Sequence, residues 1–198
     1  MSGFRDLHFD EVPVIVHASL KSFGQVDDGA QTVVSALTAV FPIVVVPTFT
    51  YKTMVTPLDG PEHNAIKYGS GTDLNRMAEF FTPEMPADPL MGIISETLRK
   101  YPNASRSIHP IQSFAGINAD EILATQRMVD PLAPLGALEQ ADGWVVLIGV
   151  DHTANTSIHY AEKLTGRRQF VRWALTLQGV VECPGFPGCS TNFQAIAP

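Results

Sequence analysis

The sequence predicts a single α/β domain of three layers, in which helices cover both faces of a mixed, partly parallel central sheet. Three short apolar runs, at residues 13–17, 43–49 and 144–150, indicate buried strands. A segment with helical spacing separates the first two of these runs. Because 198 residues can bury a sizeable core, we expect one domain over residues 1–198.

The first half of the chain contains a strand, a helix and a second strand. The second apolar run has the β-branched density that is typical of a buried strand. The apolar residues of the intervening helix, within residues 29–40, are Val33, Val34, Leu37 and Val40. A unit of this length implies parallel strands joined by a right-handed crossover.

Irregular structure and further helices are expected in the middle of the chain. Residues 51–71 are rich in Pro, Gly, Asp and Ser and predict a long loop, which is either a lid over a cleft or an ordinary surface excursion. Asp88 and the proline after it predict a helix start, and Asn118 with Glu121 predicts a capping box at another. The apolar stripe expected on the first of these helices is Leu90, Ile93, Ile94 and Leu98. Residues 183–190 are expected to be loop-like.

The charge and composition exclude several classes of protein. The formal net charge is −7, and no basic cluster is longer than Arg167–Arg168, so a nucleic acid partner is not expected. No run approaches the roughly 20 apolar residues of a membrane span, and the first residues do not resemble a signal peptide. We therefore expect a cytoplasmic protein, either a monomer or a homodimer.

The two cysteines, Cys183 and Cys189, lie in a Gly/Pro-rich segment. Their spacing fits a reduced pair, half of a metal site or a disulfide. Structural zinc takes four ligands, so two cysteines alone do not predict a metal site, and we expect no bound metal.

The residues after the third apolar run are the most informative for chemistry. His159 and Glu162 are three positions apart and therefore share one face of a helix that follows a strand. A histidine, whose ordinary pKa is near neutrality, suits a general base. Either Glu162 or Asp151 in the preceding loop could orient its ring. Thr156 and Ser157 are expected to cap the helix. The alternative is a histidine that only caps or packs.

Four blocks of sequence resemble the aminoglycoside 3-N-acetyltransferase family, and they occur in the order found in that family. They are HASLKSFG at 17–24, VPTFT at 46–50, RSIHPIQSF at 106–114 and NTSIHYAE at 155–162. The resemblance implies an enzyme that transfers an acetyl group from acetyl-CoA to the 3-amino group of an aminoglycoside and so confers antibiotic resistance. It also implies that His159 is the catalytic histidine.

The same resemblance implies the residues that bind the two substrates. The residues expected along CoA are Ser19, Leu20, Lys21, Ser22, Gly24, Val26, Ser107 and Phe114. The acceptor carries ammonium groups, which require carboxylates when they lose water. The candidate carboxylates are Glu79, Glu84 and Asp151, together with Asp27 and Asp28. His109 is expected to support the cleft by hydrogen bonding.

The chain departs from the family pattern in two places. Phe41–Pro42 stands where members of the family carry Gly-Thr, and the C-terminal part is expected to be shortened. Two alternatives therefore stay open, an N-acetyltransferase for a different amine and a catalytically impaired CoA-binding homologue. A metal-dependent hydrolase that uses Asp151, His152 and His159 is a poorer fit, because no His-Glu-x-x-His motif occurs, and a serine hydrolase would need a Gly-x-Ser-x-Gly elbow.

Overall fold

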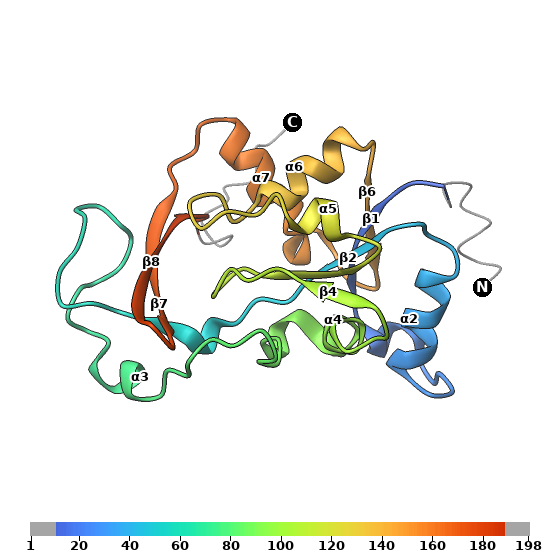
Figure 1. The fold of residues 1–198 in the computed structure, drawn as a ribbon, viewed down its shortest axis with the longest axis horizontal. Helices are drawn as coiled ribbons and strands as arrows, with labels where there is room; N and C mark the ends of the chain where they lie inside the picture. Colours follow the sequence, from blue (N-terminus) through green and yellow to red (C-terminus); the bar gives the residue numbers. More distant parts are fainter. Residues whose placement is uncertain (1–10, 189–198) are drawn as a thin grey trace.

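The central sheet has five strands in the order β4-β5-β2-β1-β6 (Figure 1), in a computed structural model that describes residues 11–188. β1 (Val14–Ala18) pairs in parallel with β2 (Val44–Pro47) and with β6 (Trp144–Ile148). β5 (Phe114–Ile117) is antiparallel to β2, and β4 (Ala104–Arg106) is antiparallel to β5. The predicted mixed, partly parallel sheet is therefore confirmed.

Helices cover both faces of this sheet, as Figure 1 shows above and below it. Side chains alternate along a strand, so Val14 and Val16 pack on one face and Ile15 packs on the other. The helices of the first face are α2 (Ala30–Thr38) and α4 (Gly92–Arg99). The helices of the second face are α5 (Asp120–Leu123), α6 (Ala133–Gln140) and α7 (Ser157–Leu164). The predicted strand, helix and strand at the start of the chain are β1, α2 and β2.

A second sheet, which the sequence did not predict, is built from β3 (Met54–Val55), β7 (Phe170–Thr176) and β8 (Gly179–Phe186). The expectation of a loop at residues 183–190 is wrong up to residue 186, where β8 ends. Cys183 is a fully buried free cysteine of this sheet, and burial raises its pKa to about 12. Such a thiol is inert at neutral pH. Cys189 lies outside the described residues.

The predicted helix start at Asp88 is confirmed, although the helix differs from expectation. The Asp88 carboxylate accepts a hydrogen bond from the amide of Leu90 (3.0 Å). The first turn is a separate 3₁₀ turn, and Gly92 (φ +81°), the first residue of α4, separates it from the helix. This break leaves Leu90 and Ile93 exposed, whereas the later residues of the predicted stripe are buried.

The capping box predicted at Asn118 is wrong. Asn118 has a positive φ of 54°, and α5 begins two residues later at Asp120. The Asn118 amide group instead donates a hydrogen bond to the carbonyl of Pro42 (2.9 Å). It therefore ties the end of β5 to the start of β2.

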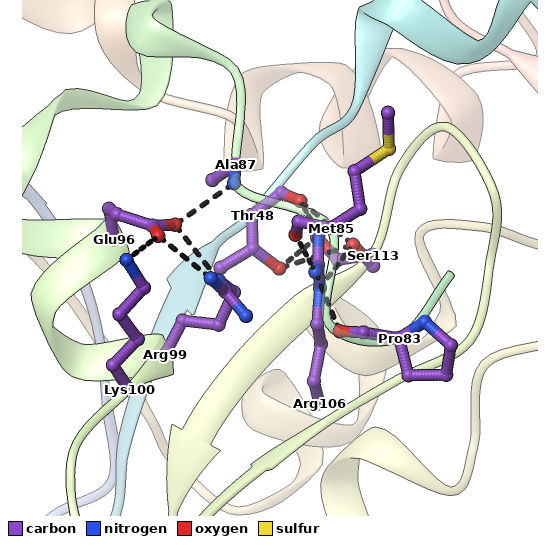
Figure 2. A network of polar contacts seen from close by, with 9 residues as sticks. All are labelled: Thr48, Pro83, Met85, Ala87, Glu96, Arg99, Lys100, Arg106 and Ser113. Carbon is purple, nitrogen blue, oxygen red and sulfur yellow. Dashed lines mark hydrogen bonds and ion pairs between the residues drawn. The ribbon is translucent and has the colours of Figure 1, made fainter. Parts of the chain in front are cut away.

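The long segment of residues 51–88 contains η2 (Tyr51–Thr53), β3, and α3 (Thr72–Arg76), and it ends at η3 (Pro89–Met91). Arg106 at the end of β4 holds the last part of this segment (Figure 2). Its guanidinium donates hydrogen bonds to the carbonyls of Thr48 (2.7 Å), Pro83 (2.9 Å) and Met85, and to the Ser113 hydroxyl (3.1 Å). A single cation thus joins the ends of β2, β4 and β5 to the segment.

Glu96 on α4 secures the same segment at a second point (Figure 2). Its carboxylate accepts hydrogen bonds from Arg99 (2.7 and 2.9 Å) and the amide of Ala87 (2.9 Å), and it pairs with Lys100 (2.8 Å). Burial opposes ionisation, but these donors outweigh it and lower the pKa of Glu96 to about 2. Within residues 11–188, no helix is long and apolar enough to cross a bilayer.

Candidate functional site

The carboxyl ends of the parallel strands β1 and β6 lie side by side. The connection after β1 leads to β2, which pairs with one edge of β1, whereas β6 pairs with the other edge. Such a switch point in a parallel sheet is where ligands bind in open α/β folds. Residues 19–24 follow β1 and include η1 (Leu20–Phe23). Because the family resemblance predicts that they bind CoA, we call them the cofactor loop. The amide of Ser19 donates a hydrogen bond to the carbonyl of Ile148 (2.9 Å) at the end of β6.

Gly149 allows the cofactor loop to approach β6 closely. Its φ is +62°, and a Cβ atom at this position would overlap the side chain of Ser22. Only glycine meets both conditions without strain. The cofactor loop and the segment that leads to α7 are therefore in direct contact.

His159 and Glu162 form the pair that their spacing predicts. The Nδ1 atom of His159 lies 2.8 Å from Oε2 of Glu162 on the same face of α7. The Glu162 side chain is 9% exposed and that of His159 is 22% exposed. A carboxylate that accepts the proton of Nδ1 selects the tautomer in which Nε2 is the basic atom. The pair has the geometry of a general base with its orienting group.

Arg167, which the sequence did not single out, completes this arrangement. Its guanidinium forms an ion pair with Oε1 of Glu162, and its amide donates to the Glu162 carbonyl (3.0 Å). The Thr165 hydroxyl donates to the same carbonyl (2.8 Å). Both carboxylate oxygens of Glu162 thus have a partner, and these contacts fix the orientation of the carboxylate relative to His159.

Asp151, the alternative partner of His159 in the prediction, caps the short turn before α7. Its carboxylate accepts hydrogen bonds from the amide (2.9 Å) and the hydroxyl (2.5 Å) of Thr153, and it caps η4 (His152–Ala154). These hydrogen bonds lower the pKa of the exposed Asp151 carboxylate. Glu162 contacts Nδ1 of His159, and the catalytic roles of Glu162 and Asp151 stay predictions. No group of three or more His, Cys, Asp or Glu side chains that could hold a metal lies within residues 11–188.

The start of α7 is capped differently from the prediction. The side chain of Asn155 accepts a hydrogen bond from the amide of Ser157 (3.0 Å), whereas the Thr156 hydroxyl makes no capping bond within the described part of the chain. The amide of Thr156 donates instead to Nε2 of His17 at the end of β1 (3.4 Å). Burial lowers the pKa of His17 to about 4.

The predicted cofactor residues fall into two groups. Lys21, Ser22 and Gly24 are exposed on the cofactor loop, beside the partly buried residues Ser19, Leu20 and Val26. Ser107 and Phe114 are buried, and the Ser107 hydroxyl accepts a hydrogen bond from the amide of Phe114 (2.8 Å). The contact of these last two with CoA stays a prediction.

His109 lines a pocket of about 530 Å³ between β4 and α5, which Ser107 also lines. Its Nδ1 atom accepts hydrogen bonds from the amides of Ile111 (3.2 Å) and Gln112 (3.0 Å). Burial lowers the pKa of His109 to about 4, and the Met128 carbonyl partly offsets this. The ring supports the turn between β4 and β5, in agreement with the predicted structural role.

The carboxylates predicted to bind the acceptor are exposed. Glu79 forms a surface ion pair with Lys52 (3.0 Å), and Glu84, Asp27 and Asp28 lie on exposed loops. Their part in binding the acceptor stays a prediction.

The fold and the site define an α/β protein with a histidine–glutamate pair on the helix that follows β6 of a partly parallel sheet. The chain belongs to the aminoglycoside 3-N-acetyltransferase family, whose model matches residues 15–181.

Individual relatives agree with this assignment. Aminoglycoside N(3)-acetyltransferase IV from Salmonella sp is 30% identical, over 75% of this chain and 51% of that protein. The crystal structure of YokD from Bacillus subtilis has a TM-score of 0.74 at 26% identity, over 91% of this chain and 71% of YokD. The structure of AAC-VIa bound to sisomicin has a TM-score of 0.70 at 29% identity, over 91% and 72%. The chain thus spans about half the length of the first of these relatives.

Proposed function

We propose that this protein transfers the acetyl group of acetyl-CoA to the 3-amino group of an aminoglycoside antibiotic, and that this acetylation confers resistance. The observation that carries the proposal is the contact of 2.8 Å between His159 and Glu162, on the helix that follows β6 beside the cofactor loop. Membership of the aminoglycoside 3-N-acetyltransferase family supports the choice of reaction.

His159 would act as the general base. An amine of an aminoglycoside is mostly protonated near neutral pH, so it must lose a proton before it can attack. Nε2 of His159 takes that proton, and the Glu162 carboxylate stabilises the resulting imidazolium. The nitrogen lone pair then forms a bond to the thioester carbonyl carbon, the C–S bond breaks, and the proton held by His159 passes to the departing sulfur. The excess proton that the new C–N bond leaves on the nitrogen is released to solvent, which gives a neutral amide. Arg167 holds Glu162 in place throughout.

The cofactor loop would bind the phosphate end of acetyl-CoA. The loop exposes the ammonium group of Lys21 and lies at the carboxyl end of β1, a position that suits a pyrophosphate. The structure of AAC-IIIb with CoASH shares this fold, with a TM-score of 0.68 at 20% identity. The acceptor's ammonium groups would pair with Glu79, Glu84 or Asp151, all of which are exposed.

The test is a thiol-release assay with acetyl-CoA and a panel of aminoglycosides. We expect thiol release with at least one of them, and mass spectrometry should place the acetyl group on the 3-amino nitrogen. The variant His159→Ala should lose about 10²- to 10⁴-fold in kcat, the contribution of a positioned base, while its affinity for CoA is unchanged.

Other outcomes would refute parts of the proposal. Thiol release with simple amines but with no aminoglycoside would refute the acceptor. Binding of CoA without any turnover would indicate the impaired homologue. A His159→Ala variant with the turnover of the wild type would refute the base.

A further inference from the structure

His17 lies where the cofactor loop and α7 meet. It is the fourth residue of β1, pairs with Leu147 of β6, and is followed two residues later by Ser19 of the cofactor loop. Because side chains alternate along a strand, His17 faces the same side of the sheet as Ile15. Ile15 belongs to the apolar cluster with Tyr160 of α7, so the His17 ring points beneath that helix.

The environment of His17 makes it a hydrogen-bond acceptor. Its side chain is 6% exposed, and burial lowers its pKa to about 4, so the ring is neutral near neutral pH. Nε2 accepts the amide of Thr156 (3.4 Å), and the ring proton is therefore on Nδ1. An apolar side chain at this position could not accept that bond.

Two hydrogen bonds in series connect His17 to His159. The amide of Thr156 donates to His17, and the carbonyl of Thr156 accepts the amide of His159 (3.1 Å). The first turn of α7 is thus attached to the central strand of the sheet through one ring nitrogen. The amide of Ser19, on the same strand end, is bound to Ile148 (2.9 Å).

We propose that His17 is a positioning residue for acetyl transfer, which holds the first turn of α7 at a fixed place relative to the cofactor loop. It sets the distance between the basic nitrogen of His159 and the thioester that the loop would present. This inference rests on the proposed function. It adds a residue that touches neither substrate and acts through the backbone of Thr156.

Three variants distinguish the effect of the hydrogen-bond acceptor on His17 from the effect of the volume of its ring. His17→Gln keeps an acceptor at about the reach of Nε2, whereas His17→Phe keeps the ring and removes the acceptor. Thr156→Pro removes the donor from the other side. Its backbone can accept proline, because Thr156 has φ −61° and the preceding Asn155 is extended (φ −80°, ψ 101°).

We expect kcat to fall about 10- to 100-fold in His17→Phe and in Thr156→Pro, since a small misplacement of a catalytic group has this effect. The KM values for acetyl-CoA and the aminoglycoside should stay within about twofold, and His17→Gln should recover most of kcat. The double variant should be no slower than the slower single variant, because both changes break the same bond. The control is Val16→Ala, which loses stability on the opposite face of the sheet and should keep kcat.

A second measurement does not depend on activity. Hydrogen exchange at the amides of Thr156 and His159, followed by NMR, should accelerate in His17→Phe and not in His17→Gln. Equal kcat in the Gln and Phe variants, an equal loss in Val16→Ala, or unchanged exchange in His17→Phe would each overturn the proposal. A wild type that acetylates no aminoglycoside would refute the proposed function, while the exchange experiment would still decide the anchoring role.

Discussion

At the scale of single residues, Gly149 is the glycine with the least room for a side chain within residues 11–188. The variant Gly149→Ala combines a left-handed backbone with an overlap onto Ser22. We expect it to lower the free energy of unfolding by roughly 1–3 kcal/mol and to raise the KM for acetyl-CoA several-fold, because the cofactor loop must move. Urea denaturation and steady-state kinetics measure the two effects.

Gly166→Ala is the matched control for this variant. Gly166 has a similar φ of +76°, but nothing lies within 4 Å of its added Cβ atom, so only the backbone strain of about 1 kcal/mol remains. The double variant Gly149→Ala/Ser22→Gly should regain stability because it removes the overlapping side chain. If Gly149→Ala and Gly166→Ala lose equal stability, the overlap has no energetic importance.

The sequence predicted the contact between His159 and Glu162 because it is local. Residues three apart on a helix share a face whatever the rest of the fold does. The partners of this pair were not predictable in the same way. Arg167 reaches Glu162 only because the chain turns back after α7, and His17 reaches Thr156 across 139 positions of sequence.

At the scale of secondary structure, the strands with a local sequence pattern were predicted, and the strands that depend on contacts with distant parts of the chain were not. β1, β2 and β6 lie in the parallel part of the sheet and appear in the sequence as apolar runs. β4 is three residues long and contains the sequence Ala-Ser-Arg at 104–106, so it carries no such signal. β7 and β8 form a hairpin whose two faces both mix polar and apolar residues, and the packing of Ala174 and Cys183 against Ile111 is a tertiary contact.

Arg106 provides a prediction at this scale, because it joins three strands to the segment of residues 83–88. Arg106→Met would leave the carbonyls of Pro83 and Met85 without this donor, whereas the Thr48 carbonyl would keep the Ser113 hydroxyl (2.8 Å). We expect a loss of roughly 2–4 kcal/mol in the free energy of unfolding and faster hydrogen exchange in the segment. Arg106→Lys should recover little, since an ammonium group lacks the planar fork that reaches all of them.

The control for Arg106 is Arg76→Met, which removes an exposed arginine. Arg76 lies 3.7 Å from Asp73, and both side chains are largely exposed. Such a pair contributes about 0–1 kcal/mol. Equal urea midpoints for Arg106→Met and the wild type would show that the segment is held by other contacts.

At the scale of the whole molecule, the two buried neutral histidines His17 and His109 and the partly buried carboxylate of Glu96 contribute to the response to acid within residues 11–188. Burial lowers the pKa values of His17 and His109 to about 4, and hydrogen bonds lower that of Glu96 to about 2. The unfolded chain therefore binds more protons than the folded one below the ordinary pKa of histidine. The histidines weaken the fold as the pH falls from about 6.5 to 4, and Glu96 does so from about 4.5 to 2.

We therefore expect the free energy of unfolding to fall by roughly 2 kcal/mol for each of these two histidines between pH 7.5 and pH 5, from 1.4 kcal/mol per pKa unit. Urea denaturation at a series of pH values measures this fall. His17→Gln should remove about half of it, since only His109 then resists protonation, and His109→Gln should remove the other half. A wild type whose stability is flat between pH 7.5 and pH 5, or a His17→Gln variant with the full fall, would show that these rings take up protons in the folded state without a penalty.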